Sequence, residues 1–250
     1  MSNTQVALVT GANKGIGLQI AKDLAARGFI VLVGSRRLGA GQDAASSIGS
    51  NAHALQLDVT DHASIAAAAA RIRNDFGRLD VLVNNAGIAH AGDPNASFEE
   101  KLLAGRPSTA SISETRAIFE TNVFGVIAVI QAMLPLLRQA PVGRVVNVSS
   151  TVGSLTLQSD PESPVRAIQS VAYVPSKTAL NAVTVAFANE LQGTYVKVNA
   201  VCPGFIATDL NNFRGTGSVA EGAREAVRLA LLGADGPTGT FSNDDGVVPW

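Results

Sequence analysis

The chain has 250 residues, of which 46% are hydrophobic and 16% are charged, a balance typical of a globular domain with a substantial buried core. Its formal net charge of -1 and the lack of any run of Lys and Arg exclude a general basic surface for nucleic acid. We therefore expect a small-molecule partner and no nucleic acid.

The sequence also bears on the cellular compartment. Cys202 is the only cysteine, so no internal disulfide can form, and a reducing, cytoplasmic setting is the simplest inference. The stretch from Met1 to Thr10 lacks the basic and apolar regions of a signal peptide. The longest apolar stretch, Val123 to Leu137, contains Gln131 and Pro135. We expect it to form a buried helix and not to span a membrane, because it is short and interrupted.

The first part of the chain has the pattern of a strand, a glycine-rich turn and an amphipathic helix. The apolar run Val6 to Val9 predicts a strand buried on both faces. Ile16, Ile20 and Leu24 then recur at helical spacing. Between strand and helix, Gly11 to Gly17 has the spacing GxxxGxG. Glycines at such a junction let the backbone approach a pyrophosphate, and the free N–H groups of the helix start favour the anion.

The second predicted strand, Phe29 to Val33, is followed by Arg36 and Arg37. In a doubly wound sheet this strand ends beside the adenosine ribose, where an acidic residue would bind the 2'-hydroxyl of NAD. The sequence has two arginines there and no acid, and guanidinium groups match phosphate geometry. Arg36 and Lys14 of the glycine turn could pair with a 2'-phosphate, so the sequence favours NADP(H) over NAD(H).

Two further strands are predicted at Ala54 to Leu57 and at Val81 to Val83. Asp58 follows the first of them, where it either bonds an adenine amino group or caps the next turn. Asn84 to Gly87 follows the second, at the carboxyl edge of the sheet where ligands bind in such folds.

Two long polar segments interrupt the second half of the pattern. Ile88 to Ser111 contains several glycines and prolines, Pro94 among them, and loops of this length usually carry function or are mobile. Glu114 to Gln139 then predicts a long helix, and Arg144 to Val148 predicts the fifth strand. Thr151 to Ala172 is the second irregular segment.

Tyr173 and Lys177 lie four residues apart at the start of the next predicted helix, so they share one helical face. A lysine held there favours the phenolate and moves a tyrosine pKa of about 10 toward neutrality. Tyr173 is therefore a candidate proton donor and acceptor. Pro175 is compatible with this helix if it lies in the first turn, where its missing N–H leaves no bond unmade.

The remaining predicted elements are a strand at Val196 to Val201, a helix at Val219 to Leu232 and a short strand near Gly239 to Ser242. The apolar segment Phe205 to Phe213 could fold over a bound ligand. Six or seven strands joined by helical crossovers predict an α/β fold. We expect a single-domain, Rossmann-type doubly wound parallel sheet with helices on both faces, formed by residues 1–250.

Six motifs in this order resemble those of the short-chain dehydrogenase/reductase family, and the resemblance covers nearly the whole chain. They are TGxxxGxG at Thr10 to Gly17, NNAG at Asn84 to Gly87, Asn122, Ser150, YxxxK at Tyr173 to Lys177, and PGxxxT at Pro203 to Thr208. The basic Lys14, the long segment before Tyr173 and the stretch from Gly236 to Trp250 look similar to the carbonyl-reductase branch.

The resemblance implies catalytic roles for four residues. Tyr173 would be the general acid toward a substrate carbonyl, and Lys177 would lower its pKa and hold the nicotinamide ribose hydroxyls. Ser150 would hydrogen-bond the carbonyl oxygen, and Asn122 would support a water relay behind Lys177. Ser150 fits better than Ser149 because a glycine follows three residues later, as is usual in the family. Strand alternation also puts the two hydroxyls on opposite faces, so only one can serve.

The resemblance also implies contacts with the cofactor, including Thr208 and the backbone at Ile206 against the nicotinamide carboxamide. The residues expected to bind NADP(H) are Gly11, Asn13, Lys14, Gly15, Ile16, Gly17, Arg36, Arg37, Asp58, Val59, Asn84, Ala86, Gly87, Tyr173, Lys177, Pro203, Gly204, Ile206 and Thr208.

The function that follows is the NADPH-dependent, reversible reduction of a ketone or aldehyde. An NADP-binding regulator that senses redox state without turnover is the alternative. No metal site is expected, since His53, His62 and His90 lack ligand spacing. The long segments near Asn122 and Tyr173 could block a helix-on-helix dimer, which leaves both a monomer and a homodimer open.

The substrate pocket is expected to be largely apolar, with His90 as a polar contact. Its expected lining is Val152, Leu155, Leu157, Phe205, Leu210 and Phe213. Cys202 is next to the predicted carboxamide-binding turn, so it is either accessible to a thiol reagent or simply a small buried packing residue.

Overall fold

The computed structural model describes residues 4–93 and 95–250. The strands are β1 (Val6–Val9), β2 (Ile30–Ser35), β3 (Ala52–Gln56), β4 (Val81–Asn84), β5 (Gly143–Val148), β6 (Val196–Val201), β7 (Phe241–Asn243) and β8 (Gly246–Val247). The α-helices are α1 (Gly15–Ala25), α2 (Leu38–Ile48), α3 (His62–Phe76), α4 (Phe98–Ala104), α5 (Ile112–Phe119), α6 (Gly125–Leu137), α7 (Leu155–Ser159), α8 (Tyr173–Glu190) and α9 (Val219–Ala230).

Within the described residues, eight strands form one sheet in the order β3-β2-β1-β4-β5-β6-β7-β8. The pairs from β3 to β7 are parallel, and β8 pairs antiparallel with β7. The strand order reverses between β1 and β4, and in such sheets ligands bind beside this switch point. The predicted doubly wound α/β fold is confirmed. The prediction of six or seven strands is wrong, since the sheet formed by the described residues has eight. Sequence patterns missed β8, because a strand of two residues is too short to show alternation or an apolar run.

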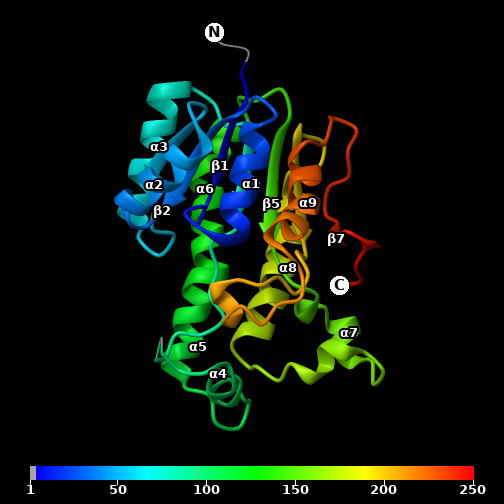
Figure 1. Ribbon diagram of the computed structural model, residues 1–250. Helices are drawn as coiled ribbons and strands as arrows, with labels where there is room; N and C mark the ends of the chain where they lie inside the picture. The colour runs from blue at the N-terminus through cyan, green and yellow to red at the C-terminus, as the bar shows by residue number, and fades with distance from the viewer. Residues whose placement is uncertain (1–3, 94) are drawn as a thin grey trace.

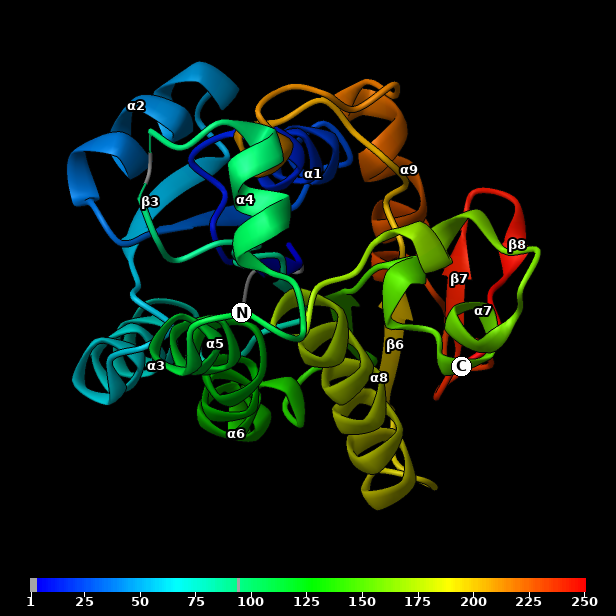
Figure 2. The ribbon, with the colours of Figure 1, turned by 90° about the horizontal axis from the view of Figure 1, so that it is seen from below.

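Helices cover both faces of the sheet: α1, α2 and α9 lie on one face, and α3, α5, α6 and α8 lie on the other (Figure 2). Side chains alternate along β1, so Ala7 and Val9 join the core under α1 and α9. Leu8 joins the core under α3, α6 and α8. Burying one side chain of this size contributes about 1.5–3 kcal/mol, so the central strands form a rigid base for their carboxyl ends.

Strand ends differ from the predicted ones by one or two residues. β2 runs two residues past the predicted end at Val33, and β3 begins two residues before Ala54. The cause is parallel pairing, which places Ser35 beside Gln56 although neither residue is apolar. The end of β2 therefore lies directly before Arg36.

The predicted long helix is one continuous helical run, Ile112–Leu137, in which a π turn at Glu120–Phe124 joins α5 to α6. π turns are frequent at functional sites, and Asn122 lies in this one. The expected apolar stretch, Val123 to Leu137, is thus part of a longer run, which is long and apolar enough to cross a membrane by length and composition. Half of its most apolar window is buried inside the protein, and we interpret it as a core helix.

Both segments expected to be irregular contain short helices. α4 lies inside the stretch Ile88 to Ser111, and its capping box joins Ser97 and Glu100 through reciprocal side-chain to backbone hydrogen bonds. α7 and a 3-10 helix at Pro164–Ala167 lie in the second segment. Figure 1 shows α4 and α7 at the same end of the sheet, away from the N-terminus. Pro94 lies outside the described residues.

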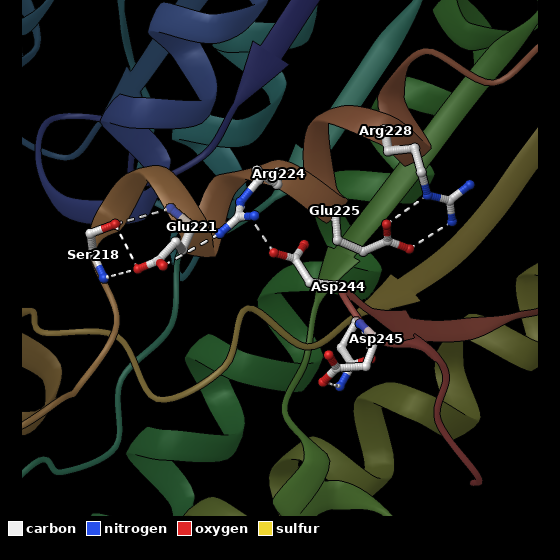
Figure 3. A network of polar contacts seen from close by, with 8 residues as sticks. Ser218, Glu221, Arg224, Glu225, Arg228, Asp244 and Asp245 are labelled. Atoms are coloured by element: carbon white, nitrogen blue, oxygen red, sulfur yellow. Dashed lines mark hydrogen bonds and ion pairs between the residues drawn. The ribbon is translucent and has the colours of Figure 1, made fainter.

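A buried carboxylate ties α9 to the last strands. Glu225 accepts two hydrogen bonds of 2.6 Å from the Arg228 guanidinium (Figure 3), and it also accepts one from the Ser242 hydroxyl on β7. The hydrogen bonds to Glu225 raise the pKa of Arg228. Arg224 forms ion pairs with Glu221 and Asp244 on the same side of the helix, but these side chains are exposed.

Replacing the buried carboxylate tests this tie. Glu225→Gln is expected to lower the free energy of unfolding by about 1–3 kcal/mol, because an amide cannot accept both hydrogen bonds from Arg228. Arg224→Gln on the same helix breaks only exposed ion pairs and should cost less than about 1 kcal/mol. Urea-induced unfolding at pH 7 measures both. Equal losses would show that Glu225 is not the residue that holds α9 in place.

Candidate active site

The glycine turn between β1 and α1 packs closely against the residues that follow β4. A Cβ on Gly11, whose φ is +63°, would lie 3.0 Å from the Cα of Ala86. A Cβ on Gly17 would lie 2.3 Å from Asn85 Nδ2, which donates hydrogen bonds to the Thr10 and Gly11 carbonyls. Sequence reasoning missed Asn85, although its place in the NNAG motif was the available signal. Its amide fixes the shape of the turn.

The start of α1 suits a pyrophosphate. Gly15 has a φ of +59°, and a Cβ there would have one neighbour within 4 Å, Thr208 Cγ2 at 3.6 Å. The first N–H groups of a helix have no partner within the helix, so they attract an anion. The turn is thus open above Gly15 and carries the donors that a dinucleotide needs. The glycine turn and the start of α1 therefore fit the pyrophosphate of the predicted NADP(H).

Three of the residues expected to bind the cofactor direct their side chains into the protein. Asn84 is buried and donates from Nδ2 to Asn147 Oδ1 on β5 at 2.8 Å. Val59 belongs to the core under α3 and α6, and Ile16 packs against the core under α1 and α9. Asn84 and Val59 are buried, so we expect them to contact a ligand through their backbone, whereas Ile16 is only partly buried.

The end of β2 carries unpaired positive charge. Among residues 4–93 and 95–250, no carboxylate lies within ion-pair distance of Arg36 or Arg37, and both residues are exposed. Lys14 instead pairs with Asp209, with 3.2 Å between Nζ and Oδ2. Asp58 accepts two hydrogen bonds from Thr60, so it caps the turn after β3, which is one of the two predicted alternatives.

Tyr173, Ser150 and Lys177 come together at the carboxyl end of β5. The Ser150 hydroxyl is close enough to the Tyr173 phenol to lower its pKa. Lys177 Nζ lies 5.7 Å from the centroid of the Tyr173 ring and donates to the Val148 carbonyl at 2.8 Å. Tyr173 opens α8, and Pro175 lies in the first turn as predicted.

The two serines after β5 point in different directions, as strand alternation predicts. The Ser149 hydroxyl is buried and donates to Asn181 Oδ1 at 2.6 Å. Ser150 alone faces the phenol.

Asn122 joins the segment after β4 to the start of α8. Its Oδ1 accepts from the Ile88 N–H at 2.9 Å, and its Nδ2 donates to the Ile88 carbonyl at 2.8 Å and to Ser176 Oγ at 3.0 Å. The Ser176 hydroxyl in turn donates to the Tyr173 carbonyl at 2.7 Å. Both amide hydrogens are used in this clamp, so a water relay would have to use another atom of Asn122.

Burial controls the titration of the central pair. It raises the pKa of Tyr173, and the nearby Cys202 raises it further, whereas the neighbouring Ser150 hydroxyl lowers it. Burial also lowers the pKa of Lys177 to about 8. The expectation that Lys177 moves the pKa of Tyr173 toward neutrality is not met, because loss of solvation disfavours the charged form of both groups. At pH 7 Tyr173 is a neutral phenol, the form that donates a proton.

The turn after β6 begins at Pro203, and Gly204 has a φ of +86°. Cys202 is buried before it and its Sγ accepts from the Gly204 N–H at 3.4 Å. The Ile206 carbonyl accepts from Asn211 Nδ2, and Thr208 caps the 3-10 helix Asp209–Asn211. Cys202 thus brings the turn close to the Tyr173 phenol, and Thr208 brings it close to Gly15 of the glycine turn.

The predicted apolar pocket is only partly formed by the expected side chains, since Leu155, Phe205, Leu210 and Phe213 are exposed. A groove of about 330 Å³ lies between α4 and the segment before Tyr173, lined by Glu99, Leu102, Leu103, Arg106, Ala167 and Gln169. Sequence reasoning missed these α4 residues, because it treated their segment as a loop. His90 pairs with Glu114 at 3.7 Å.

The histidines do not form a metal site. His53 lies on β3 and His62 begins α3, and both are exposed. In the part of the chain that the structure describes, no group of three His, Cys, Asp or Glu side chains could hold a metal ion.

A family model described as "short chain dehydrogenase" matches residues 5–217. The chain belongs to the short-chain dehydrogenase family. It is 36% identical to (-)-isopiperitenone reductase of Mentha piperita over 299 positions, which cover 94% of this chain and 95% of the relative. That alignment is longer than the chain, so the relative carries segments that this chain lacks. The predicted family is confirmed, and the protein is an oxidoreductase of that family.

Solved structures agree with this assignment. Salutaridine reductase from Papaver somniferum has a TM-score of 0.80 and 31% identity, with 96% of this chain and 99% of that chain covered. NADPH-bound carbonyl reductase from chicken fatty liver has a TM-score of 0.82 and 27% identity, with 100% of both chains covered.

A pair of glycine substitutions tests the packing of the turn. Gly17→Ala is expected to destabilise the protein by about 1–3 kcal/mol, because the new Cβ would collide with Asn85 and with the Gly11 carbonyl. Gly39→Ala in α2 is the control, since no atom lies within 4 Å of its Cβ position. It should be neutral or stabilising by up to about 1 kcal/mol. Thermal unfolding measures both, and a stable Gly17→Ala protein would contradict the close packing.

Proposed function

We propose that the protein reduces a ketone or aldehyde to an alcohol with NADPH, in a reversible hydride transfer. The observation that carries the proposal is the convergence of the Ser150 hydroxyl, the Tyr173 phenol and the Lys177 ammonium at the carboxyl end of β5. Relatives named as reductases, and the fold shared with an NADPH-bound carbonyl reductase, support this class of reaction.

The proposed chemistry places two donors on one oxygen. Tyr173 donates its phenolic proton to the substrate carbonyl, and the Ser150 hydroxyl donates a hydrogen bond to the same atom. Both act where negative charge develops during reduction, and one such donor is typically worth about 3–4 kcal/mol. The nicotinamide of bound NADPH supplies the hydride. Lys177 holds positive charge near the phenol and favours the phenolate that remains.

The cofactor is proposed to lie across the carboxyl ends of β1, β2 and β4. The turn from Gly11 to Gly17 would hold its pyrophosphate, and Arg36 with Lys14 would hold its 2'-phosphate. The end of β2 has no acidic residue for a 2'-hydroxyl, which favours NADPH over NADH. Lys177 would also bond the nicotinamide ribose, and the backbone at Ile206 with Thr208 would orient the carboxamide.

Asn122 is proposed as a positioning residue. Its amide holds Ile88 and Ser176 together, and Ser176 is bonded to the Tyr173 backbone. The NNAG segment and the first turn of α8 are therefore fixed relative to each other. This keeps the phenol at a constant distance from the cofactor side of the crevice.

The two neighbouring serines allow a matched test of the proposed chemistry. Ser150→Ala should lower kcat of NADPH-dependent reduction by about 10²–10³-fold, because one donor to the developing charge is lost. Ser149→Ala loses the bond to Asn181 and a longer one, of 3.5 Å, to the Lys177 carbonyl, but no contact with the phenol, and should retain kcat within about tenfold. Tyr173→Phe should lose nearly all turnover, because the phenyl ring cannot donate a proton. Absorbance of NADPH with a panel of carbonyl compounds measures the rates.

Binding measurements complete this test. Ser149→Ala and Ser150→Ala should bind NADPH as wild type does, as shown by nicotinamide fluorescence, and Tyr173→Phe should still bind it. Full activity of Tyr173→Phe, or a larger loss in Ser149→Ala than in Ser150→Ala, would contradict the proposed roles. Tight NADPH binding by the wild type with no NADPH oxidation across the panel would favour the redox-sensing alternative.

A further inference from the structure

The ion pair between Lys14 and Asp209 joins the glycine turn to the segment 205–217, which follows β6. Nζ and Oδ2 are 3.2 Å apart, and more than half of each side chain is exposed. The two segments also approach each other here, because a Cβ on Gly15 would lie 3.6 Å from the Thr208 side-chain atom Cγ2. Asp209 thus lies beside Lys14, the residue that the proposed function assigns to the 2'-phosphate.

The backbone of Asp209 is held by hydrogen bonds within its own segment. Asp209 opens the 3-10 helix Asp209–Asn211, and buried Asn211 donates from Nδ2 to the Ile206 carbonyl at 2.9 Å. The Phe213 N–H donates to the Thr208 carbonyl at 2.9 Å. The lysine side chain is long and flexible, so its ammonium can leave the carboxylate without any movement of the Asp209 backbone.

The far end of the same segment is attached to α4. Arg214 Nη2 lies 2.7 Å from Glu99 Oε1, and its guanidinium lies 5.6 Å from the centroid of the Phe98 ring. Lys101 Nζ donates to Asn212 Oδ1 at 3.0 Å. The segment therefore stays attached to α4 when the ion pair with Lys14 breaks. Glu99 is a carboxylate that contacts the same segment but not Lys14, so its substitution serves as a control for the loss of one negative charge.

The charges at Lys14 favour an exchange of partners. An exposed ion pair with one carboxylate is weak, because water screens both groups. A phosphate monoester carries about -1.5 to -2 charges near pH 7 and offers three acceptor oxygens. A 2'-phosphate would therefore draw the Lys14 ammonium away from Asp209. NADH lacks this phosphate, so it gains nothing from the exchange.

We propose that Asp209 is a specificity-determining residue that competes with the 2'-phosphate of NADPH for the Lys14 ammonium. Asp209 holds the ammonium in the absence of the phosphate, so part of the affinity for NADPH is spent on displacing it. The preference for NADPH over NADH is then lower than Lys14 and Arg36 alone would give. This inference rests on the proposed NADPH dependence, and it adds a residue that sets how strongly NADPH is preferred over NADH.

Dissociation constants for NADPH and NADH, measured by isothermal titration calorimetry at low salt, test the competition. Asp209→Asn should tighten NADPH binding about threefold, the value expected for losing a competing exposed ion pair, and leave NADH binding unchanged. In a Lys14→Gln background the same substitution should have no effect, because the contested ammonium is gone. Glu99→Gln also removes one negative charge beside the segment, and it should bind both cofactors as wild type does.

Several results would overturn the proposal. One is an unchanged NADPH dissociation constant in Asp209→Asn, and another is an equal gain in affinity for NADH. A gain in NADPH affinity that persists in the Lys14→Gln background, or the same gain in Glu99→Gln, would also overturn it. A wild-type protein that binds NADH more tightly than NADPH would overturn the proposed NADPH dependence as well. Wild-type preference for NADPH with no change in Asp209→Asn would overturn the role of Asp209 alone. Asp209→Ser carries the same expectations, and thermal unfolding confirms that each variant is folded.

Discussion

The hydrogen bond from the Lys177 ammonium to the Val148 carbonyl is the interaction on which the active-site geometry depends. It is 2.8 Å long, lies in the buried interior and joins α8 to the carboxyl end of β5. Ser150 lies two residues past Val148, and Tyr173 lies one helical turn before Lys177. One bond therefore sets the serine hydroxyl against the phenol. A buried ammonium without such a partner would be strongly destabilising, so the contact that orients the site also makes the buried charge tolerable.

Glycines give the lysine room to reach this position. A Cβ on Gly153 would lie 2.7 Å from the Lys177 carbonyl carbon, so any larger residue would push α8 away from the strand end. This is a physical reason for a glycine three residues after Ser150. A Cβ on Gly87 would lie 3.3 Å from Asn122 Oδ1 and 3.6 Å from Lys177 Nζ. The NNAG segment, the π turn and α8 thus meet around one ammonium group.

Sequence patterns predicted the features that depend on local rules. Continuous apolar runs, which are typical of strands buried on both faces, identified the parallel strands. The alternation of side chains along a strand distinguished Ser150 from Ser149. The short helix α4 was missed because Gly105 and Pro107 close by suggested a loop, although Ser97 and Glu100 already formed a capping pattern. Features that depend on the folded interior left no local signal. The raised pKa of Tyr173 follows from burial, and the partner of Lys14 comes from a segment almost two hundred residues away.

The pH dependence of kcat/KM for carbonyl reduction tests the central role of buried Lys177 most directly, because this quantity reports groups of the free enzyme. Burial lowers the pKa of Lys177 to about 8, so the ammonium is present below that pH and is lost above it. Burial raises the pKa of Tyr173, so the phenol keeps its proton over the same range. The account predicts a plateau below about pH 8, a decline above it, and a low, flat profile for Lys177→Met. An activity that rises through pH 8, or a decline that survives in Lys177→Met, would contradict it.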